Sequence, residues 1–270
     1  MKFAIDHDYH IHSFLSLCSE DENQTKEAIL DYARKNGLKK ICLTDHVWDT
    51  GGCSFTGDHF YATQTIPHIR QSLPLPQDPD VEFYFGCETE FDKFFRVGLA
   101  RENFDQFDFV IIPTTHTHMV GFTLAEEDNT EERRAALFIE RLDALLDLDL
   151  PFEKIGIAHL TCCFAGVDSN KDSQRRVLAS IPDAELYRIF GRIAKAGAGF
   201  ELNEDMFQYN EEELAAQLRY YRIAKECGCK FYLGSDAHTP EGLAAAMEGF
   251  QRMIDLLELE ENDKFRPFAE

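Results

Sequence analysis

The sequence predicts an α/β barrel in which seven short strands alternate with helices, residues 1–270 forming one domain. From the first strand end at His10 to the last at Ala237 there are 227 residues. Over six repeats this is roughly 38 residues each, in line with a βα unit. Nearly every predicted strand also ends in His, Asp or Glu. An open, doubly wound sheet fits the alternation as well, but only a closed barrel brings all these ends to one face.

The first half of the chain contains four predicted strands, at residues 3–11, 39–44, 81–86 and 107–113. Residues 25–36 are expected to form a helix, because their apolar side chains fall on one face and Gly37 follows. A second helix is expected over residues 59–73, broken at Pro67. The Gly-containing loop at 49–58 is expected to be a mobile cover over the strand ends.

The second half repeats the pattern with shorter connections. Its predicted strands are residues 155–158, 198–203 and 230–234, and its predicted helices are 131–148, 183–196, 211–226 and 241–257. Pro182 and Gly197 bracket one of these helices, as Pro and Gly commonly do. The acidic segment 258–263 is expected to be solvated.

The charge balance excludes two classes of partner. The chain has 27 Lys and Arg against 49 Asp and Glu, a formal net charge of −22, which repels nucleic acid and anionic membranes. No apolar run approaches the roughly 20 residues that span a bilayer, and the N-terminus lacks the apolar region of a signal peptide. The eight cysteines are therefore expected to be reduced thiols in a cytoplasmic protein.

The strand ends carry the residues from which metal sites are built. His10 and His12 lie two positions apart, so in a strand their imidazoles share one face, as half of a site for zinc or a similar ion. The later strand ends add Asp45 and His46, Glu88 and Glu90, His116 and His118, His159, Glu201 and Asn203, and Asp236 and His238. Seven of the ten histidines fall at these ends, which favours a metal cluster over unrelated buried or capping residues.

The ordered motifs carry a family resemblance. DYHIHS, LTDH, GCETE, the strand end at His116, AHL, ELN and GSDAH, which together span residues 8–238, resemble the successive motifs of the PHP (polymerase and histidinol phosphatase) superfamily. The resemblance implies a distorted (β/α)7 TIM-like barrel that binds two or three divalent ions, usually Zn, Fe or Mn. It also implies phosphoesterase activity.

The resemblance assigns roles residue by residue. It implies three ligand sets: His10, His12, Glu88 and Asp236 for one ion, Glu88 with His116 and His159 for a second, and His46 with His238 for a third. Cys18 stands where histidinol phosphatases usually have a His and some relatives an Asp. A thiolate is a competent zinc ligand, so Cys18 either completes the third set or is a packing residue. Asp45 and Glu90 are expected to orient histidines.

The predicted reaction is hydrolysis of a small phosphomonoester, such as histidinol phosphate or a nucleotide, by hydroxide formed on the metal ions. His118 and Asp45 are the candidate catalytic side chains. His118 either protonates the leaving alkoxide or lies at the rim. Lys171, Arg175 and Arg176, expected in the loop after the fifth strand, either contact the phosphate or are solvated.

Two other functions fit a ligand-rich barrel. One is an amidohydrolase or deaminase, which also uses an HxH pair and a late Asp. It is disfavoured because the fourth strand ends without Lys and because His46 and His238 would have no role. The other is a non-catalytic regulatory module that binds metal, which nothing in the sequence excludes.

Overall fold

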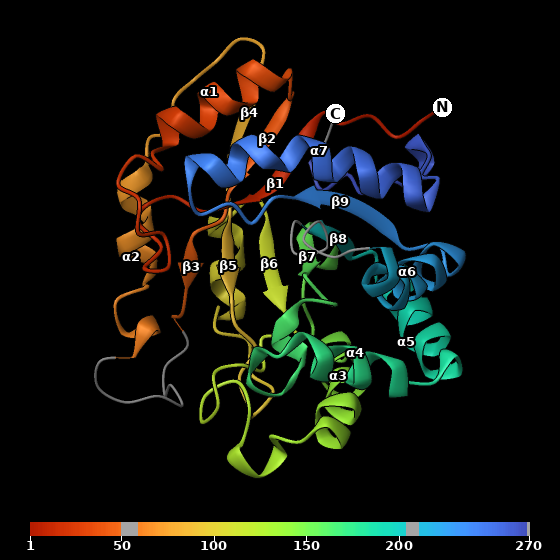
Figure 1. Ribbon diagram of the computed structural model, residues 1–270. Coiled ribbons are helices and arrows are strands. Elements are labelled where there is room, and N and C mark those ends of the chain that lie inside the picture. Colours follow the sequence, from red (N-terminus) through yellow and green to blue (C-terminus); the bar gives the residue numbers. More distant parts are fainter. Residues whose placement is uncertain (50–58, 204–210, 269–270) are drawn as a thin grey trace.

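Short parallel strands form a closed, distorted TIM-like barrel, as the sequence predicts (Figure 1). The computed structural model describes residues 1–49, 59–203 and 211–268, so the predicted cover at 49–58 lies outside the described residues except for Asp49. The described strands are β1 (His7–Ile11), β2 (Lys40–Leu43), β3 (His46–Val47), β4 (Glu82–Phe85), β5 (Cys87–Thr89), β6 (Val110–Pro113), β7 (Ile155–Ala158), β8 (Gly199–Asn203) and β9 (Lys230–Gly234).

The strands form two hydrogen-bonded sheets that together make the barrel wall. The sheet orders are β1-β2-β4 and β3-β5-β6-β7-β8-β9, and every ladder is parallel. Because β3 continues β2 and β5 continues β4 after a short break, the wall has seven strand positions. Backbone hydrogen bonds close it between β1 and β9: the Asp236 amide donates to the His10 carbonyl at 2.7 Å, and the His12 amide donates to the Ala237 carbonyl at 3.1 Å.

Helices cover the outside of the barrel. The longer described ones are α1 (Lys26–Asn36), α3 (Glu131–Leu146), α4 (Lys171–Ser180), α5 (Asp183–Ala196), α6 (Glu211–Glu226) and α7 (Pro240–Leu257). In Figure 1, α1 and α7 lie together beside β1 and β2, while α3 to α6 cover the opposite side. No described helix is long and apolar enough to cross a bilayer.

Local sequence signals explain where these helices begin and end. The Thr25 side chain accepts a hydrogen bond from the Ala28 amide at the start of α1, and Gly37 ends the helix with a left-handed φ of 71°. Gly197 ends α5 in the same way with a φ of 84°. The apolar face of α5, which includes Ile189 and Ile193, is buried against the barrel.

Three sequence predictions about elements are wrong. Residues 59–73 do not form one helix: a 3-10 turn at Phe60–Ala62 is followed by the one-turn α2 (Ile66–Ile69), because Thr65 caps a new helix whose first turn contains Pro67. Residues after the fifth strand, expected to be loop, include the helix α4. The acidic 258–263 segment is not fully solvated, since Leu259 is buried in the core.

Aromatic side chains fill the barrel at the end opposite the ligands. Tyr9 on β1, Tyr232 on β9 and Phe109, directly before β6, form one buried cluster. Phe265 and Phe268, from the segment after α7, pack against this cluster. The Phe265 amide donates to the Phe231 carbonyl at 2.7 Å, which fixes the segment across the strand starts. The interior is therefore a packed core, open only toward the strand ends.

Arg141 on α3 joins the segments that follow β5 and β6. Its guanidinium is buried and donates to the carbonyls of Thr114 (2.6 Å), Thr123 (2.9 Å), Asp92 (3.1 Å) and Phe91. Burial lowers the pKa of Arg141 to about 10, so the side chain stays charged at neutral pH. Arg141 therefore fixes the backbone just after Glu90 and the backbone on both sides of His116.

We expect Arg141→Met to destabilise the fold by about 3–5 kcal/mol, because it removes the guanidinium that donates to four backbone carbonyls. Of these carbonyls, that of Asp92 also accepts from the Phe95 amide and keeps this second donor. The free energy of unfolding measured by urea denaturation checks this. Arg188→Met on α5 is the matched control, since Arg188 is exposed and pairs only with surface carboxylates, whose loss costs less than about 1 kcal/mol. Equal destabilisation by the two substitutions would contradict the role given to Arg141.

Candidate metal centre

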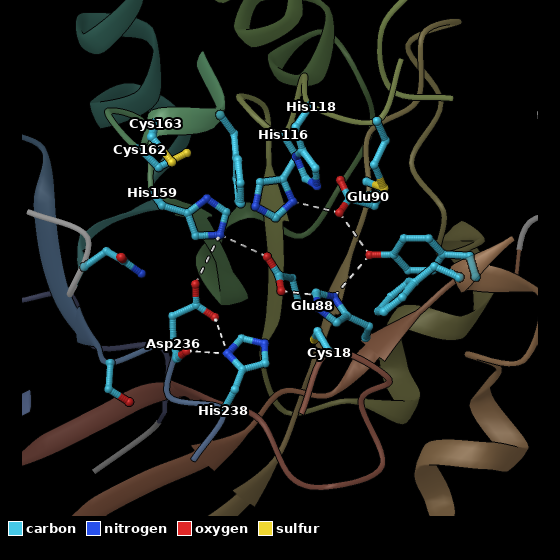
Figure 2. A pocket seen from close by; sticks show the side chains of 17 residues that line it. Cys18, Glu88, Glu90, His116, His118, His159, Cys162, Cys163, Asp236 and His238 are labelled. Atoms are coloured by element: carbon cyan, nitrogen blue, oxygen red, sulfur yellow. Dashed lines mark hydrogen bonds and ion pairs between the residues drawn. The ribbon is translucent and has the colours of Figure 1, made fainter. Parts of the chain in front are cut away.

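Most of the residues expected as ligands line one cavity at the strand ends (Figure 2), and the buried His10 and His12 contact two of them, Glu88 and Asp236. The cavity has a volume of about 650 Å³, and Glu88, His116, His159, Asp236 and His238 line it. His10, His46 and Glu88 lie within β1, β3 and β5, whereas the other expected histidine and aspartate ligands follow their strands by one to four residues. Their convergence follows from the parallel barrel, in which every strand ends on the same face.

Four side-chain atoms have the spacing of a tetrahedral metal site. His10 Nε2, His12 Nε2, Glu88 Oε2 and Asp236 Oδ1 form one group, and five of their six separations are 3.0, 3.4, 3.3, 3.3 and 3.1 Å. A regular tetrahedron with such edges has its centre about 2.0 Å from each corner, which is the length of a bond from Zn to N or O. The residues present therefore fit a divalent ion.

Glu88 links this group to a second one. Its Oε2 belongs to the first group, while its Oε1 lies 3.1 Å from His159 Nε2. His116 and His159 stack with ring centroids 4.3 Å apart, and the two imidazoles with Glu88 form a second candidate ligand set. Figure 2 shows Glu88 between the His159 and His116 side and the side occupied by His238.

A third set consists of imidazoles alone. His12 stacks on His238 at 4.2 Å and lies 4.5 Å from the ring of His46, and these three can hold one ion. Cys18 lines the same cavity, but its sulfur is not among the grouped ligand atoms of the described residues. The structure thus places Cys18 at the centre without showing it as a ligand.

The cluster attracts positive charge. Burial lowers the pKa of His10, but the carboxylates of Asp236, Glu201 and Glu88 outweigh burial and raise it well above its ordinary value. Burial raises the pKa of Glu88, but His46 and His10 outweigh it and hold that pKa well below its usual range. Without metal, protons on imidazoles balance the carboxylates, and a divalent ion supplies the same positive charge.

Two carboxylates orient histidines from behind. Glu201 Oε1 lies 2.6 Å from His10 Nδ1, and its Oε2 accepts from the His159 amide at 2.7 Å. Glu90 Oε1 lies 2.8 Å from His116 Nδ1 and also accepts from the Tyr61 hydroxyl at 2.9 Å. Each carboxylate fixes a proton on Nδ1 and leaves Nε2 free to bind metal. Glu90 therefore lies where the sequence prediction expected it, whereas the contact from Glu201 had not been assigned.

A serine transmits the effect of Asp45 to His12. Asp45 accepts from the Ser13 amide, the Ser13 hydroxyl and the Ser16 hydroxyl at 2.7–2.8 Å. Because the Ser16 proton goes to Asp45, its oxygen accepts from the His46 amide and from His12 Nδ1 at 3.0 Å. His12 Nε2 therefore carries no proton and is free to bind a metal ion. Asp45 acts through Ser16 and does not line the cavity, so the structure gives it an orienting contact rather than a catalytic one.

Two of the grouped residues have an uncommon backbone conformation. His159 has a φ of 29° and Asp236 a φ of 53°, both in the left-handed region that non-glycine residues seldom adopt. Each follows directly or closely on the end of its strand and turns the chain so that its side chain enters the cavity. Such strain is often found at functional sites, where the surrounding contacts hold it.

The remaining candidate residues divide into two groups. His118 lines the cavity, and burial together with the charges of His116 and His159 lowers its pKa to about 3. Lys171, Arg175 and Arg176 lie on α4 and not in a loop, which fits the alternative that they are solvated charges on a helix, and none of them is among the described residues that line the cavity. Arg176 forms an ion pair with Glu131 at 2.6 Å on the outer surface.

Sequence and structure comparisons agree on the family. The family model described as the PHP domain matches residues 8–205, most of the chain. The chain belongs to the PHP domain family. The ligand cluster is what this family predicts, so the protein is a metal-dependent phosphoesterase, and the recognition made from the ordered motifs is confirmed. No curated protein matches the chain at a significant level.

Solved structures that share this fold include two that are described as histidinol phosphatases. The histidinol phosphate phosphatase of Lactococcus lactis subsp. lactis Il1403, complexed with zinc, L-histidinol and phosphate, has a TM-score of 0.59 and 18% identity, over 97% of this chain and 98% of that one. A candidate histidinol phosphatase of Listeria monocytogenes has a TM-score of 0.58 and 14% identity, over 90% and 99%. At these identities the comparison establishes the distorted barrel fold and not the substrate.

We expect Glu201→Gln to weaken metal binding by about 10- to 100-fold, because a neutral amide no longer fixes the proton on His10 Nδ1. Metal titration followed by calorimetry measures this. Glu153→Gln, an exposed residue on the barrel's outside, is the control and should leave the affinity unchanged. Unaltered affinity in Glu201→Gln would show that the contact between Glu201 and His10 does not support the centre.

Proposed function

We propose that this PHP protein hydrolyses a small phosphomonoester using two or three divalent ions, Zn, Fe or Mn. The proposed ligands are His10, His12, Glu88 and Asp236 for one ion, Glu88, His116 and His159 for a second, and His46 with His238 for a third. The observation that carries the proposal is the tetrahedral spacing of the first group together with the position of Glu88 between two groups. Cys18, which lines the same cavity as His46 and His238, is the proposed further ligand of the third set.

Side chains in and around the cavity prepare the site for this chemistry. When bound, divalent ions lower the pKa of water and hold phosphoryl oxygens, which supports in-line attack near neutral pH. Glu88 and Asp236 supply the negative charge that gathers the cations. Glu201, Glu90 and the Ser16 hydroxyl hold the imidazoles in the tautomer that binds metal. We infer that His118, which lines the cavity, contacts the leaving group.

The size and charge of the molecule favour a small metabolite. A cavity of about 650 Å³ lies in the range that accommodates one small ligand. The net charge of −22 opposes binding of a nucleic acid. The Lactococcus lactis relative is complexed with L-histidinol and phosphate, which makes histidinol phosphate one reasonable member of the class. A nucleotide monophosphate is another.

A substrate panel tests the proposal. The protein is stripped with a chelator, reloaded with Zn, Mn or Fe(II), and assayed with histidinol phosphate, nucleoside monophosphates, a phosphodiester and amides. We expect metal-dependent release of inorganic phosphate from one or more monoesters. Faster turnover of the diester would correct the substrate class, and turnover of amides alone would favour an amidohydrolase. Stoichiometric metal binding without any turnover would favour a regulatory module.

We expect Glu88→Gln and Asp236→Asn each to lower kcat/KM by at least about a hundredfold, since each removes a charge from the centre. Both changes preserve size, so the fold is retained. Metal content and circular dichroism are measured with the kinetics. Full turnover in either variant at saturating metal would show that the centre has been placed on the wrong residues.

A further inference from the structure

The wall of the cavity beyond the ligands is an aromatic pair. The imidazole of His118 stacks on the ring of Phe164, with centroids 3.9 Å apart and planes inclined by 27°. Both side chains line the cavity and are half-buried. His118 Nδ1 is buried and has no hydrogen-bond partner among the described residues. The pair thus contributes aromatic surface to the wall of the cavity.

Arg134 on α3 ties the two halves of this pair together. Its Nη1 donates to Thr117 Oγ1 at 2.6 Å and to the Phe164 carbonyl at 2.9 Å, and its Nη2 donates to the Thr117 carbonyl at 3.0 Å. Nη2 and Nε donate to Asn129 Oδ1 at 2.8 and 3.1 Å. All five N–H groups of the guanidinium are therefore used. Thr117 directly precedes His118 in the sequence. Arg134 therefore holds the backbone next to His118 and also the backbone carbonyl of Phe164.

Stability alone does not explain why the charge of Arg134 is buried. Arg134 is 3% exposed, and burial lowers its pKa. Its hydrogen bonds end on neutral oxygens, so a buried charge is held without a hydrogen-bonded carboxylate among the described residues. Burying a charge in this way often contributes less stability than an apolar side chain of similar volume. The guanidinium instead contributes a fixed geometry. Its planar set of donors determines how the backbone at Thr117 lies relative to the backbone at Phe164.

We propose that Arg134 is a positioning residue that holds His118 and Phe164 as one wall for the leaving group, and that this wall favours phosphomonoesters whose alcohol carries an aromatic ring. The inference rests on the proposed function and specifies its substrate. An aromatic ring gains stacking with the pair that a flexible polyol does not. Both rings of the wall also pack edge-on against His116, but His116 has its own hydrogen bond to Glu90, so we expect this ligand to stay in place when the wall is loosened.

Arg134→Met and Phe164→Leu test the wall from its two sides, with Arg133→Met as the matched control. Arg133 is the neighbouring residue on α3, but its ion pairs with Asp128 and Glu140 lie at the surface. Kinetics are measured with benzyl phosphate and glycerol phosphate. We expect the KM for benzyl phosphate to rise about three- to tenfold in both wall variants, the factor that one aromatic contact supplies. We expect a much smaller change in kcat and in the KM for glycerol phosphate, with unchanged metal content.

A second readout does not need turnover. In histidine-labelled protein the ring protons of His118, assigned with His118→Gln, should show an upfield ring-current shift from Phe164. We expect Arg134→Met and Phe164→Leu to remove this shift and Arg133→Met to retain it. If the wild-type protein hydrolyses no phosphomonoester, including those of the substrate panel, the proposed function has failed, and this shift alone decides whether Arg134 positions the pair. Hydrolysis of other monoesters but not of benzyl phosphate would overturn the preference for an aromatic alcohol. Retention of the shift in Arg134→Met, or equal changes in KM for the two substrates, would overturn the inference.

Discussion

The backbone hydrogen bonds between β1 and β9 are the constraint on which the rest of the structure depends. The Asp236 amide donates to the His10 carbonyl, and these two residues also supply ligand atoms to the first group. Closing the barrel and assembling the centre are therefore one event. Because the centre then holds Glu88 and Asp236 close together, bound cations stabilise the closed barrel, and metal binding is coupled to folding.

The sequence predicted the barrel and the positions of the ligands well because both depend on local patterns. A strand places residues two apart on one face, and parallel strands end on one side, so His10 and His12 could be assigned to a shared face before any contact was known. The strand over residues 155–158 and the helix over 183–196 also have the expected bounds, since clear apolar runs and a flanking Pro or Gly mark them.

The rest depends on contacts between distant parts of the chain. Tyr61 and Arg134 act through hydrogen bonds to residues far away in sequence, and no spacing rule connects a serine at position 16 with an aspartate at position 45. The left-handed backbone at His159 carries no sequence signal, because such residues are usually Gly or Asn. The helix α4 was missed because its polar sequence resembles a loop more than an amphipathic helix.

The family boundary and the boundary of the folded unit differ. The matched region ends at residue 205, whereas Asp236, His238 and the strand that closes the barrel lie beyond it. A fragment cut at the family boundary would keep β1 to β8 but expose two unpaired strand edges, on β1 and β8, where β9 now lies. Such edges are templates for pairing with other chains. Expression of residues 8–205 alone would therefore yield an aggregating fragment rather than a smaller enzyme.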